Sequence, residues 1–413
     1  MRKEEFYREA RPQSVGPLEG TRVLEATTSY AGPMAGTVLA DLGAEVVKVD
    51  FPETGELIRH VGPFVPSRSK LDSSAFHLSI NRNKKCISLD LRTPEGREIF
   101  QQLTARMDIV IENFKPGTME GWGLGYEEVR KGKPDIIYTS VSGYGQYGPY
   151  SHRPGYDHIG QAMGGLMSIN GYPDTPPTRT GNAMIDNITG WQGAFGTLAA
   201  LFCREKTGQG QHVDASLLDS ALYTTELGIM AAANANYLWQ RMGCGHPAAG
   251  GEHPYSCQDG YLVISANNMV HWPRLCRIMG REDLIEDPRT NTVAARAENR
   301  KLVAETIDSW TRKHTIQQVL EVLEEAEIVC APVLNFKQIL EVDHIRERGM
   351  VAEVEHPTAG RLQLYGVATK FSRTPAGVRT PAPLLGQHNE EVYGNLLGLS
   401  RERMAELKEK GII

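Results

Sequence analysis

The stretch Thr21–Asp50, TRVLEATTSYAGPMAGTVLADLGAEVVKVD, contains two short β-rich runs with a helical pattern between them. The runs are Thr21–Ala26 and Glu45–Asp50, and the helical pattern, Pro33–Leu42, has a proline in its first turn. Proline is tolerated there because the first N–H groups of a helix have no partner within the helix. A strand, a helix and a second strand in this order predict parallel strands joined by a right-handed crossover.

The same alternation continues through the first half of the chain. Further candidate strands are Lys85–Leu91, Asp108–Glu112, Asp135–Ser142 and Gln211–Ser216. The clearest helical patterns between them are Pro94–Arg106, with Thr93 as N-cap, and Met184–Arg204. The strands are apolar on successive residues, which is typical of strands covered on both faces. The sequence therefore predicts an α/β fold with a doubly wound parallel sheet.

The composition changes after a long helical pattern, Leu217–Trp239. The segment Arg241–Gly260 is rich in glycine, proline and histidine and has no periodicity, which indicates a domain boundary or an active-site loop. Beyond it, a smaller α/β domain is predicted from Tyr261–Asn267, Val270–Met279, Ala297–Lys313, Ile316–Ala326 and Ile328–Leu334. The chain then returns to β character over Gly349–Lys370 and closes with a helical pattern, Ser400–Lys410.

Composition and charge exclude several classes of function. The 413 residues carry a formal net charge of −6, which gives no support to binding of nucleic acid or anionic membranes. The six cysteines are scattered without C-x-x-C spacing and are expected to be reduced thiols. The N-terminus lacks the apolar core of a secretory signal, and no apolar run reaches the roughly 20 residues of a membrane helix. We expect a soluble, cytoplasmic protein.

The loop Gly143–Gly148, GYGQYG, matches the G-x-G-x-x-G pattern of dinucleotide-binding loops directly after a predicted strand. That fingerprint also needs a helix that begins on the loop and an acidic residue about 20 positions further on. Here Pro149, Pro154 and Gly155 follow, and no acid stands at that distance, so NAD is not expected. A glycine-lined loop at the carboxyl end of a strand is still where open α/β sheets bind ligands.

Two other kinds of site find little support. His246, Glu252 and His253 fit no H-E-x-x-H helix, and neighbouring prolines argue against a helical presentation, so no metal centre is expected. The chain also lacks a G-x-S-x-G motif, which leaves serine-hydrolase chemistry without a nucleophile.

Asp157 lies in Arg153–Gly165, RPGYDHIGQAMGG, and has two compatible interpretations. The simpler one is that it caps a helix over His158–Met163. A carboxylate at a helix N-terminus feels the positive end of the dipole and accepts amide hydrogen bonds, so it stays ionised. An ionised, oriented carboxylate can act as a nucleophile where water is kept away.

Short motifs along the chain resemble those of the class III CoA-transferases, the family that contains formyl-CoA transferase and the carnitine CoA-transferase. The motifs occur in order at Ala31–Pro33, Leu42–Lys48, Asn81–Lys85, Glu112–Gly117, Ser142–Pro149, Arg153–Asp157 and Thr207–Gln211. Each motif is weak alone, but together they extend the resemblance from about Leu18 to the C-terminus.

The resemblance implies a large Rossmann-like domain built from both ends of the chain and a smaller α/β domain inserted between them. The expected boundaries are 1–225 for the large CoA-binding domain, 226–340 for the small domain with its linkers, and 341–413 for the return to the large domain. Two chains are expected to interlock as a homodimer, and a heteromer with a paralogous subunit is the alternative.

The resemblance also implies a mechanism in which Asp157 is the nucleophile. Its carboxylate attacks an acyl-CoA, a mixed anhydride and then an aspartyl-CoA thioester form, and the acceptor acid takes over the CoA. Water must be excluded because an open anhydride would hydrolyse. The active-site loop residues are expected to be Gly250, Gly251, Tyr144, Gly145 and Gln161. The expected CoA contacts are Tyr30, Ala31, Gly32, Pro33, Arg59, Arg82, Asn83, Lys84, Asn113 and Phe114.

Two departures from the family pattern bear on these expectations. The segment that corresponds to the family's glycine-rich flap, Gly245–His253, has two adjacent glycines rather than a run of four. Gly121 stands where many relatives have an arginine, so one phosphate contact is missing or is supplied elsewhere.

No permanently bound cofactor is expected, because coenzyme A and the acyl-CoA are substrates. The working hypothesis is a succinyl-CoA donor and a dicarboxylic or aryl-substituted acid, such as a substituted succinate, as acceptor. One alternative is an α-methylacyl-CoA racemase, which needs two bases beside the α-carbon. Racemases of this fold have a histidine just before the aspartate, whereas Tyr156 precedes Asp157. A second alternative is a subunit that only binds CoA.

Overall fold

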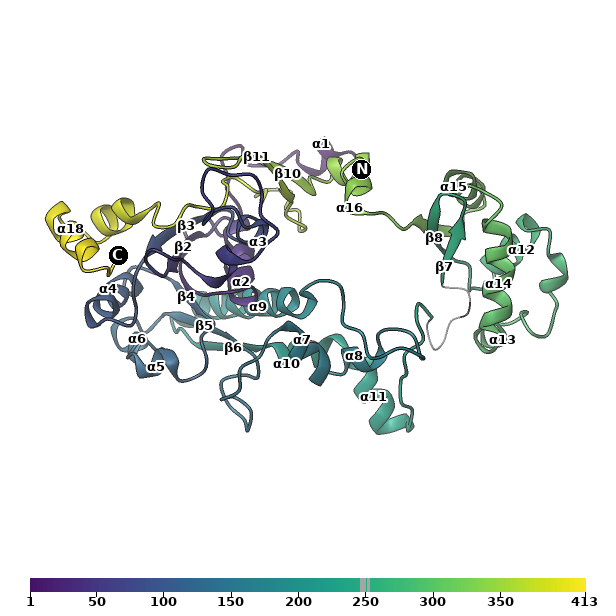
Figure 1. The fold of residues 1–413 in the computed structure, drawn as a ribbon, viewed down its shortest axis with the longest axis horizontal. Helices are drawn as coiled ribbons and strands as arrows, with labels where there is room; N and C mark the ends of the chain where they lie inside the picture. Colours follow the sequence, from purple (N-terminus) through teal and green to yellow (C-terminus); the bar gives the residue numbers. More distant parts are fainter. Residues whose placement is uncertain (246–249, 251–252) are drawn as a thin grey trace. The chain divides into compact units, whose positions relative to one another are not determined.

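The structure, a computed structural model, describes residues 1–245, 250 and 253–413. It divides the chain into two compact units (Figure 1). The first unit contains residues 1–164, 181–225 and 343–413, and the second contains 165–180 and 226–342. The first unit is thus built from both ends of the chain.

The first unit is organised around a six-stranded sheet in the order β3-β2-β1-β4-β5-β6, with every neighbouring pair parallel. The strands are β1 Arg22–Ala26, β2 Glu45–Asp50, β3 Lys84–Ser88, β4 Ile109–Glu112, β5 Ile137–Ser142 and β6 His212–Ser216. The chain moves outward in one direction from β1 to β3 and in the other from β4 to β6. This is the doubly wound arrangement that the sequence predicts.

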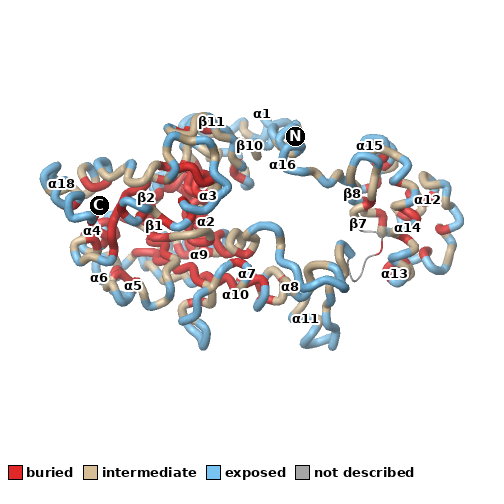
Figure 2. Tube along the Cα trace, viewed as in Figure 1, coloured by how far each residue is buried: buried red, intermediate tan, exposed pale blue. Residues whose placement is uncertain are grey.

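Both faces of this sheet are covered, as the successive apolar residues of its strands predict. Val23 of β1 packs on one face with Leu39 of α2 and Ala194 of α9. Its neighbour Leu24 packs on the opposite face with Phe100 of α4. Figure 2 shows the buried segments concentrated in the strands and in the helices against them.

The helices of the first unit are α1 Lys3–Phe6, α2 Ala31–Asp41, α3 Ala75–Ile80, α4 Pro94–Thr104, α5 Thr118–Gly121, α6 Tyr126–Gly132, α7 Asp157–Met163, α9 Met184–Thr207, α10 Leu217–Thr224, α17 Asp343–Glu347 and α18 Arg401–Glu409. A 3₁₀ turn covers Leu57–His60 and a π-helical segment covers Glu390–Leu396. The Thr93 hydroxyl accepts from Gly96 N–H at the start of α4, so the predicted N-cap is confirmed.

The C-terminal part of the chain returns to the first unit and binds beside β3. It contains the antiparallel pair β10 Val351–His356 and β11 Gly360–Tyr365. The side-chain oxygen of Asn83 accepts from the N–H groups of Arg379 and Thr380 at 2.7 and 3.0 Å. Asn83 has a φ of +60°, a conformation that asparagine tolerates better than most residues. This residue therefore fixes the returning segment to the edge of the sheet.

The second unit mixes helices with a three-stranded antiparallel sheet in the order β7-β8-β9. The strands are β7 His253–Cys257, β8 Gly260–Ser265 and β9 Val329–Pro332, and the helices are α8 Leu166–Ile169, α11 Glu226–Ala235, α12 His271–Ile278, α13 Val293–Glu298, α14 Arg300–Thr311, α15 Ile316–Glu325 and α16 Phe336–Ile339, with a 3₁₀ turn over Glu282–Leu284. Leu262 and Trp272 are among the residues of its buried core.

Residues 165–180 group with the second unit, whereas the sequence-based division put them in the first part. Backbone contacts explain this. The guanidinium of Arg241 donates to the carbonyl oxygens of Tyr172 and Thr175 at 3.3 and 3.1 Å. The N–H of Gly243 donates to the carbonyl of Gly171 at 2.9 Å.

Two helical patterns expected to be continuous are interrupted, so those predictions are wrong. Leu217–Trp239 divides at Thr225, whose hydroxyl donates to the carbonyl of Gly164 at 3.1 Å and whose backbone leaves the helical region. Ala297–Lys313 is divided at Asn299, which ends α13 with φ −101° and ψ 33°. Among the described residues, no helix combines the length and apolar character needed to cross a bilayer.

Candidate functional site

A cavity of about 240 Å³ lies at the carboxyl ends of β1, β4 and β5 in the first unit. Its lining comes from the end of β5, the segments after the three strands, the loop before α7 and the first turns of α9 and α10: Thr28, Ser29, Tyr30, Ala31, Asn113, Phe114, Lys115, Pro116, Val141, Ser142, Gly143, Arg153, Pro154, Gly155, Tyr156, Asp186 and Leu217. Because β1 and β4 are neighbours, the direction of the strand order changes here. Open α/β sheets bind ligands at such a point.

Asn113 joins the two segments that meet at this change of direction. Its side-chain oxygen accepts from Thr28 N–H at 2.8 Å, and its Nδ2 donates to the Thr28 carbonyl at 2.7 Å. Gly32 lies against the same side chain, because a Cβ on it would come within 2.7 Å of the Asn113 Cγ. A side chain at position 32 would therefore separate the ends of β1 and β4.

Two glycines bring the loop before Asp157 to the end of β5. A Cβ on Gly143 would lie 2.7 Å from the Cα of Gly155, and a Cβ on Gly155 would lie 2.6 Å from the Cα of Gly143. Backbones can approach this closely only where neither residue has a side chain. The contact fixes the position of Tyr156 and hence of Asp157, the first residue of α7.

Asp157 is not the N-cap of its own helix, so that expectation is wrong. The N-cap is Tyr156, and the carboxylate of Asp157 points to the beginning of α9 instead. Its Oδ1 accepts from the N–H groups of Ile185 and Asp186 at 2.8 and 3.3 Å. Its Oδ2 accepts from the amide nitrogen of Gln161 at 2.6 Å. Asp157 is 6% exposed and is not among the residues that line the cavity.

Asp186 supplies the carboxyl group in the part of the cavity lining that the structure describes. It lies in the first turn of α9, a helix of 24 residues. Burial, and then the charge of Asp157, raise the pKa of the Asp186 carboxyl to about 7. A carboxyl group with a pKa this far above its usual range, at a ligand cavity, is a candidate for catalysis.

Asp186 is not among the residues predicted from the sequence, although a signal was present. The next charged residue after Asp186 is Arg204, near the end of α9. An acidic residue that stands alone at the start of such a long uncharged stretch is expected to lie at a helix N-terminus and in apolar surroundings.

Four of the ten predicted CoA contacts line the cavity: Tyr30, Ala31, Asn113 and Phe114. Gly32 and Pro33 follow directly in the first turn of α2 and are buried. Burial, the largest effect, raises the pKa of the Tyr30 phenol to about 12.

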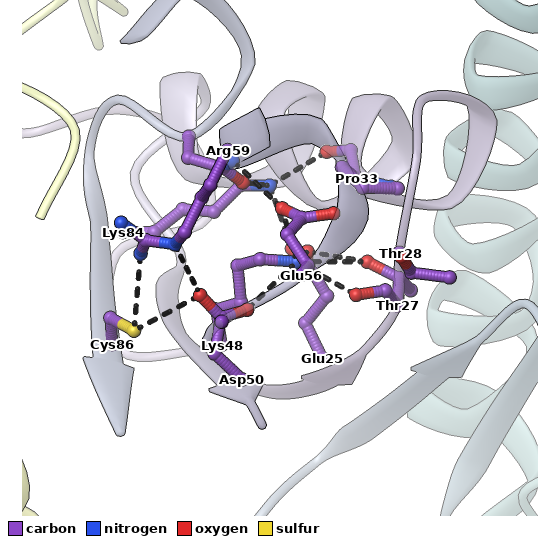
Figure 3. A network of polar contacts seen from close by, with 12 residues as sticks. Glu25, Thr27, Thr28, Pro33, Lys48, Asp50, Glu56, Arg59, Lys84 and Cys86 are labelled. Carbon is purple, nitrogen blue, oxygen red and sulfur yellow. Dashed lines mark hydrogen bonds and ion pairs between the residues drawn. The ribbon is translucent and has the colours of Figure 1, made fainter. Parts of the chain in front are cut away.

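The predicted cationic contacts lie inside the protein. Arg59 is 1% exposed, with its guanidinium 2.8 Å from Asp50 and 2.5 Å from Asp72. Arg82 is buried against Asp41 at 2.6 Å. Lys84 and the polar network that contains it appear in Figure 3. A cation inside a protein needs an anionic partner. In these ion pairs, the N–H donors that were expected to contact the phosphates of CoA bind carboxylates of the protein instead. Lys115 and Arg153 are the cations that line the cavity among the described residues.

The predicted active-site loop residues fall in different places. Gly145 has a φ of +87°, and its N–H donates to the Ser142 hydroxyl at 2.9 Å, so this amide already has a partner within the protein. The Tyr144 hydroxyl contacts the sulfur of Met163 at 3.4 Å. Gly250 belongs to the second unit, where a Cβ on it would meet the Arg296 carbonyl at 2.2 Å. Gly251 lies outside the described residues.

Comparison with known proteins identifies close relatives. The family model described as CoA-transferase family III matches residues 18–389. A succinyl-CoA–D-citramalate CoA-transferase of Chloroflexus aurantiacus is 38% identical, over 96% of this chain and 98% of the relative. A succinyl-CoA:glutarate CoA-transferase of Mus musculus is 37% identical, over 98% of this chain and 92% of the relative.

Solved structures agree with the sequence relatives. The crystal structure of a CaiB/BaiF family protein from Brucella suis matches with a TM-score of 0.84 and 32% identity, over 93% of this chain and all of the other.

Proposed function

The chain belongs to CoA-transferase family III, and from that premise we propose that it transfers coenzyme A from succinyl-CoA to a dicarboxylic acid through the carboxylate of Asp186. That it is a CoA-transferase follows from the family and its named relatives. The donor, the acceptor and the reacting residue are the proposal. The two named relatives use succinyl-CoA with citramalate or glutarate, both dicarboxylic acids.

The observation that carries the proposal is the different surroundings of the two aspartates. Asp186 lines the cavity, and Tyr30 and Ala31 belong to the same lining. Both oxygens of Asp157 accept hydrogen bonds from the protein, and its side chain is 6% exposed and is not part of the described cavity lining. A nucleophile must reach the substrate carbonyl. The sequence-based hypothesis named Asp157 as the nucleophile. We propose Asp186 for that role and Asp157 as the residue that positions it, and covalent trapping of the intermediate distinguishes the two.

The reaction conserves an activated acyl bond at each step. The Asp186 carboxylate attacks the thioester carbonyl of succinyl-CoA, which gives a succinyl-aspartyl anhydride and the CoA thiolate. The thiolate attacks the aspartyl carbonyl of the anhydride, which releases succinate and leaves an aspartyl-CoA thioester. The acceptor carboxylate attacks this thioester, giving a second anhydride and the thiolate again. The thiolate then attacks the acceptor's acyl carbonyl, which forms the new acyl-CoA and restores the Asp186 carboxylate.

Positively charged side chains at the cavity favour the binding of anionic substrates. Lys115 and Arg153 are exposed, and the guanidinium of Arg153 lies 3.9 Å from the ring of Tyr150, which orients it. Coenzyme A carries phosphates, and a dicarboxylic acid brings a second negative charge, so local cations favour both. No permanently bound cofactor is part of this proposal.

Racemisation receives less support. It needs two bases, and the part of the cavity lining that the structure describes contains no histidine to serve as the second one. A subunit that only binds CoA would not need Asp186 at the cavity. The interlocked homodimer and the cytoplasmic location stay predictions.

The test is a CoA-transfer assay with succinyl-CoA and a panel of mono- and dicarboxylic acids. We expect turnover with at least one five- or six-carbon dicarboxylic acid. Failure with every dicarboxylate, together with turnover of a monocarboxylate, would contradict the proposed substrate class. Racemisation of a 2-methylacyl-CoA without CoA transfer would contradict the reaction.

A further inference from the structure

The loop between β1 and α2 carries part of the cavity lining in a strained conformation. Its residues Thr28, Ser29 and Tyr30, followed by Ala31, all line the cavity. Ser29 has a φ of +66°, which a residue other than glycine rarely adopts. Such strain persists where the surrounding structure holds both ends of the segment in place.

Lys48 of β2 holds the beginning of this loop. Its ammonium group donates to the carbonyl oxygen of Thr27 at 2.8 Å. It also lies 3.3 Å from Glu25 and 3.0 Å from Glu56 (Figure 3). Lys48 is fully buried; burial acts to lower its pKa, but Glu56, Glu25 and Asp50 outweigh this and raise it. Lys48 is therefore a permanent cation under the loop.

Lys84 of β3 holds the other end of the loop. Its ammonium group donates to the carbonyl oxygen of Pro33, in the first turn of α2, at 2.7 Å. It also donates to Asn81 at 3.0 Å and lies 2.8 Å from Glu25. Its exposed fraction is 3%. An ammonium group this deeply buried is stable only with partners, and one of its three is a backbone carbonyl that borders the cavity loop.

Glu25 of β1 connects the two lysines. Its Oε1 faces Lys48 and accepts from the Thr27 hydroxyl at 2.7 Å, and its Oε2 faces Lys84. The fit of α2 over this carboxylate is close, because a Cβ on Gly36 would lie 1.8 Å from Oε2. One buried carboxylate thus sets the positions of two cations, each of which holds one end of the loop.

We propose that Lys48, Glu25 and Lys84 form a buried clamp that fixes the loop Thr28–Ala31 in the conformation that binds the CoA thioester. The clamp residues are positioning residues, since they act through the backbone carbonyls of Thr27 and Pro33 and do not contact the ligand. For Lys84, this positioning role replaces the contact with a CoA phosphate that was expected from the sequence. The inference rests on the proposed function only in its choice of ligand.

Two readouts distinguish a clamp from a merely structural ion pair. The first is the dissociation constant of a non-hydrolysable CoA thioether, such as S-propyl-CoA, measured by calorimetry. The second is hydrogen exchange of the peptide that spans residues 27–33. For Lys84→Met we expect a dissociation constant at least about tenfold higher, and faster exchange confined to this peptide.

A double variant separates binding from stability. Glu25→Gln with Lys84→Met removes one negative and one positive charge, so it leaves fewer unbalanced buried charges than Lys84→Met alone. We expect its melting temperature to recover part of the loss, while CoA-thioether binding stays weak because Pro33 O has still lost its donor. If Lys84→Met does not fold, this double variant carries the test.

The matched control is Lys85→Met, on the same strand. Lys85 pairs with Glu45 and Glu391 and does not contact the loop. We expect its thioether affinity and its exchange over 27–33 to match those of the wild type. A folded Lys84→Met or double variant with wild-type affinity would overturn the clamp. Wild-type protein that binds the thioether but transfers no CoA would instead contradict the proposed function and leave this comparison valid.

Discussion

The Oδ1 of Asp157 accepts a hydrogen bond of 3.3 Å from the backbone N–H of Asp186, which lies 29 residues further along the chain. The two aspartates are thus coupled at the start of α9. The carboxylate of Asp157 acts as the cap of that helix. Burial, and then the charge of Asp157, raise the pKa of the Asp186 carboxyl, which lines the cavity. The proposed function assigns the nucleophile to Asp186 and the positioning role to Asp157, whereas the sequence-based hypothesis assigned both tasks to Asp157.

Replacing the two aspartates is expected to have unequal effects. Asp186→Asn removes the proposed nucleophile and should lower kcat on the order of 10³-fold or more. Asp157→Asn keeps a side-chain oxygen that can accept the hydrogen bond from Ile185 N–H, so its kcat should be no more than about 10²-fold below that of the wild type. Initial rates of CoA transfer, with circular dichroism to verify folding, measure both. Equal loss in the two variants would leave the assignment to Asp186 without support.

The Asp157 side chain should also contribute to stability. Asp157→Ala removes the acceptor from the N–H groups of Ile185 and Asp186, so we expect a loss of about 1–2 kcal/mol in the free energy of unfolding. Asp157→Asn should lose less. Urea denaturation of both variants provides the comparison, and an unchanged midpoint for Asp157→Ala would show that the cap is dispensable.

Acylation of the enzyme should depend on pH. The pKa of Asp186 is about 7, and the carboxylate is the form that attacks. The rate of CoA release in a single turnover with succinyl-CoA is therefore expected to rise from pH 6 to pH 8 and then level off. Stopped-flow detection of free thiol measures this step. A rate that is constant over this range would mean that another group limits the step or performs it.

The same raised pKa makes Asp186 a destabilising group at high pH. Its folded pKa of about 7 exceeds its unfolded value, so the folded state binds the proton more tightly and stability falls as pH rises between the two values. Asp186→Asn is therefore expected to melt a few degrees above the wild type at pH 8 and at a similar temperature at pH 4. Differential scanning calorimetry at both pH values makes the comparison. A lower melting temperature for the variant at pH 8 would contradict this sign.

The contact between Gly143 and Gly155 is expected to be intolerant of a methyl group. Gly155→Ala would bring a Cβ within 2.6 Å of the Gly143 Cα, so the loop that carries Asp157 must move. We expect a loss of about 1–3 kcal/mol in stability and a lower kcat. Gly121→Ala is the control, since a Cβ there has nothing within 4 Å. Comparable melting temperatures and rates for the two variants would argue against the role of this contact.

The sheet could be predicted from the sequence because its signals are local. In β1, Val23 and Leu24 are successive apolar residues, and each packs on a different face. The first turn of α2 was marked by Pro33. The interruption at Thr225 was not predictable in the same way, because it depends on a hydrogen bond to Gly164, far away in the sequence.

The site was harder to predict because its partners are distant in the chain. Lys84 stands in a run of charged residues that resembles a solvated surface, but Glu25, on the central strand β1, pairs with it in the interior. Asp157 looked like the cap of the helix that follows it, whereas it caps the helix that begins near Ile185. Only the folded backbone brings these groups together.

Covalent trapping tests the central claim most directly. The protein is incubated with succinyl-CoA, the intermediate is treated with hydroxylamine or borohydride, and the modified peptide is identified by mass spectrometry. We predict modification of Asp186 in the wild type and none in Asp186→Asn. Modification of Asp157, or turnover without modification of either aspartate, would contradict the assignment.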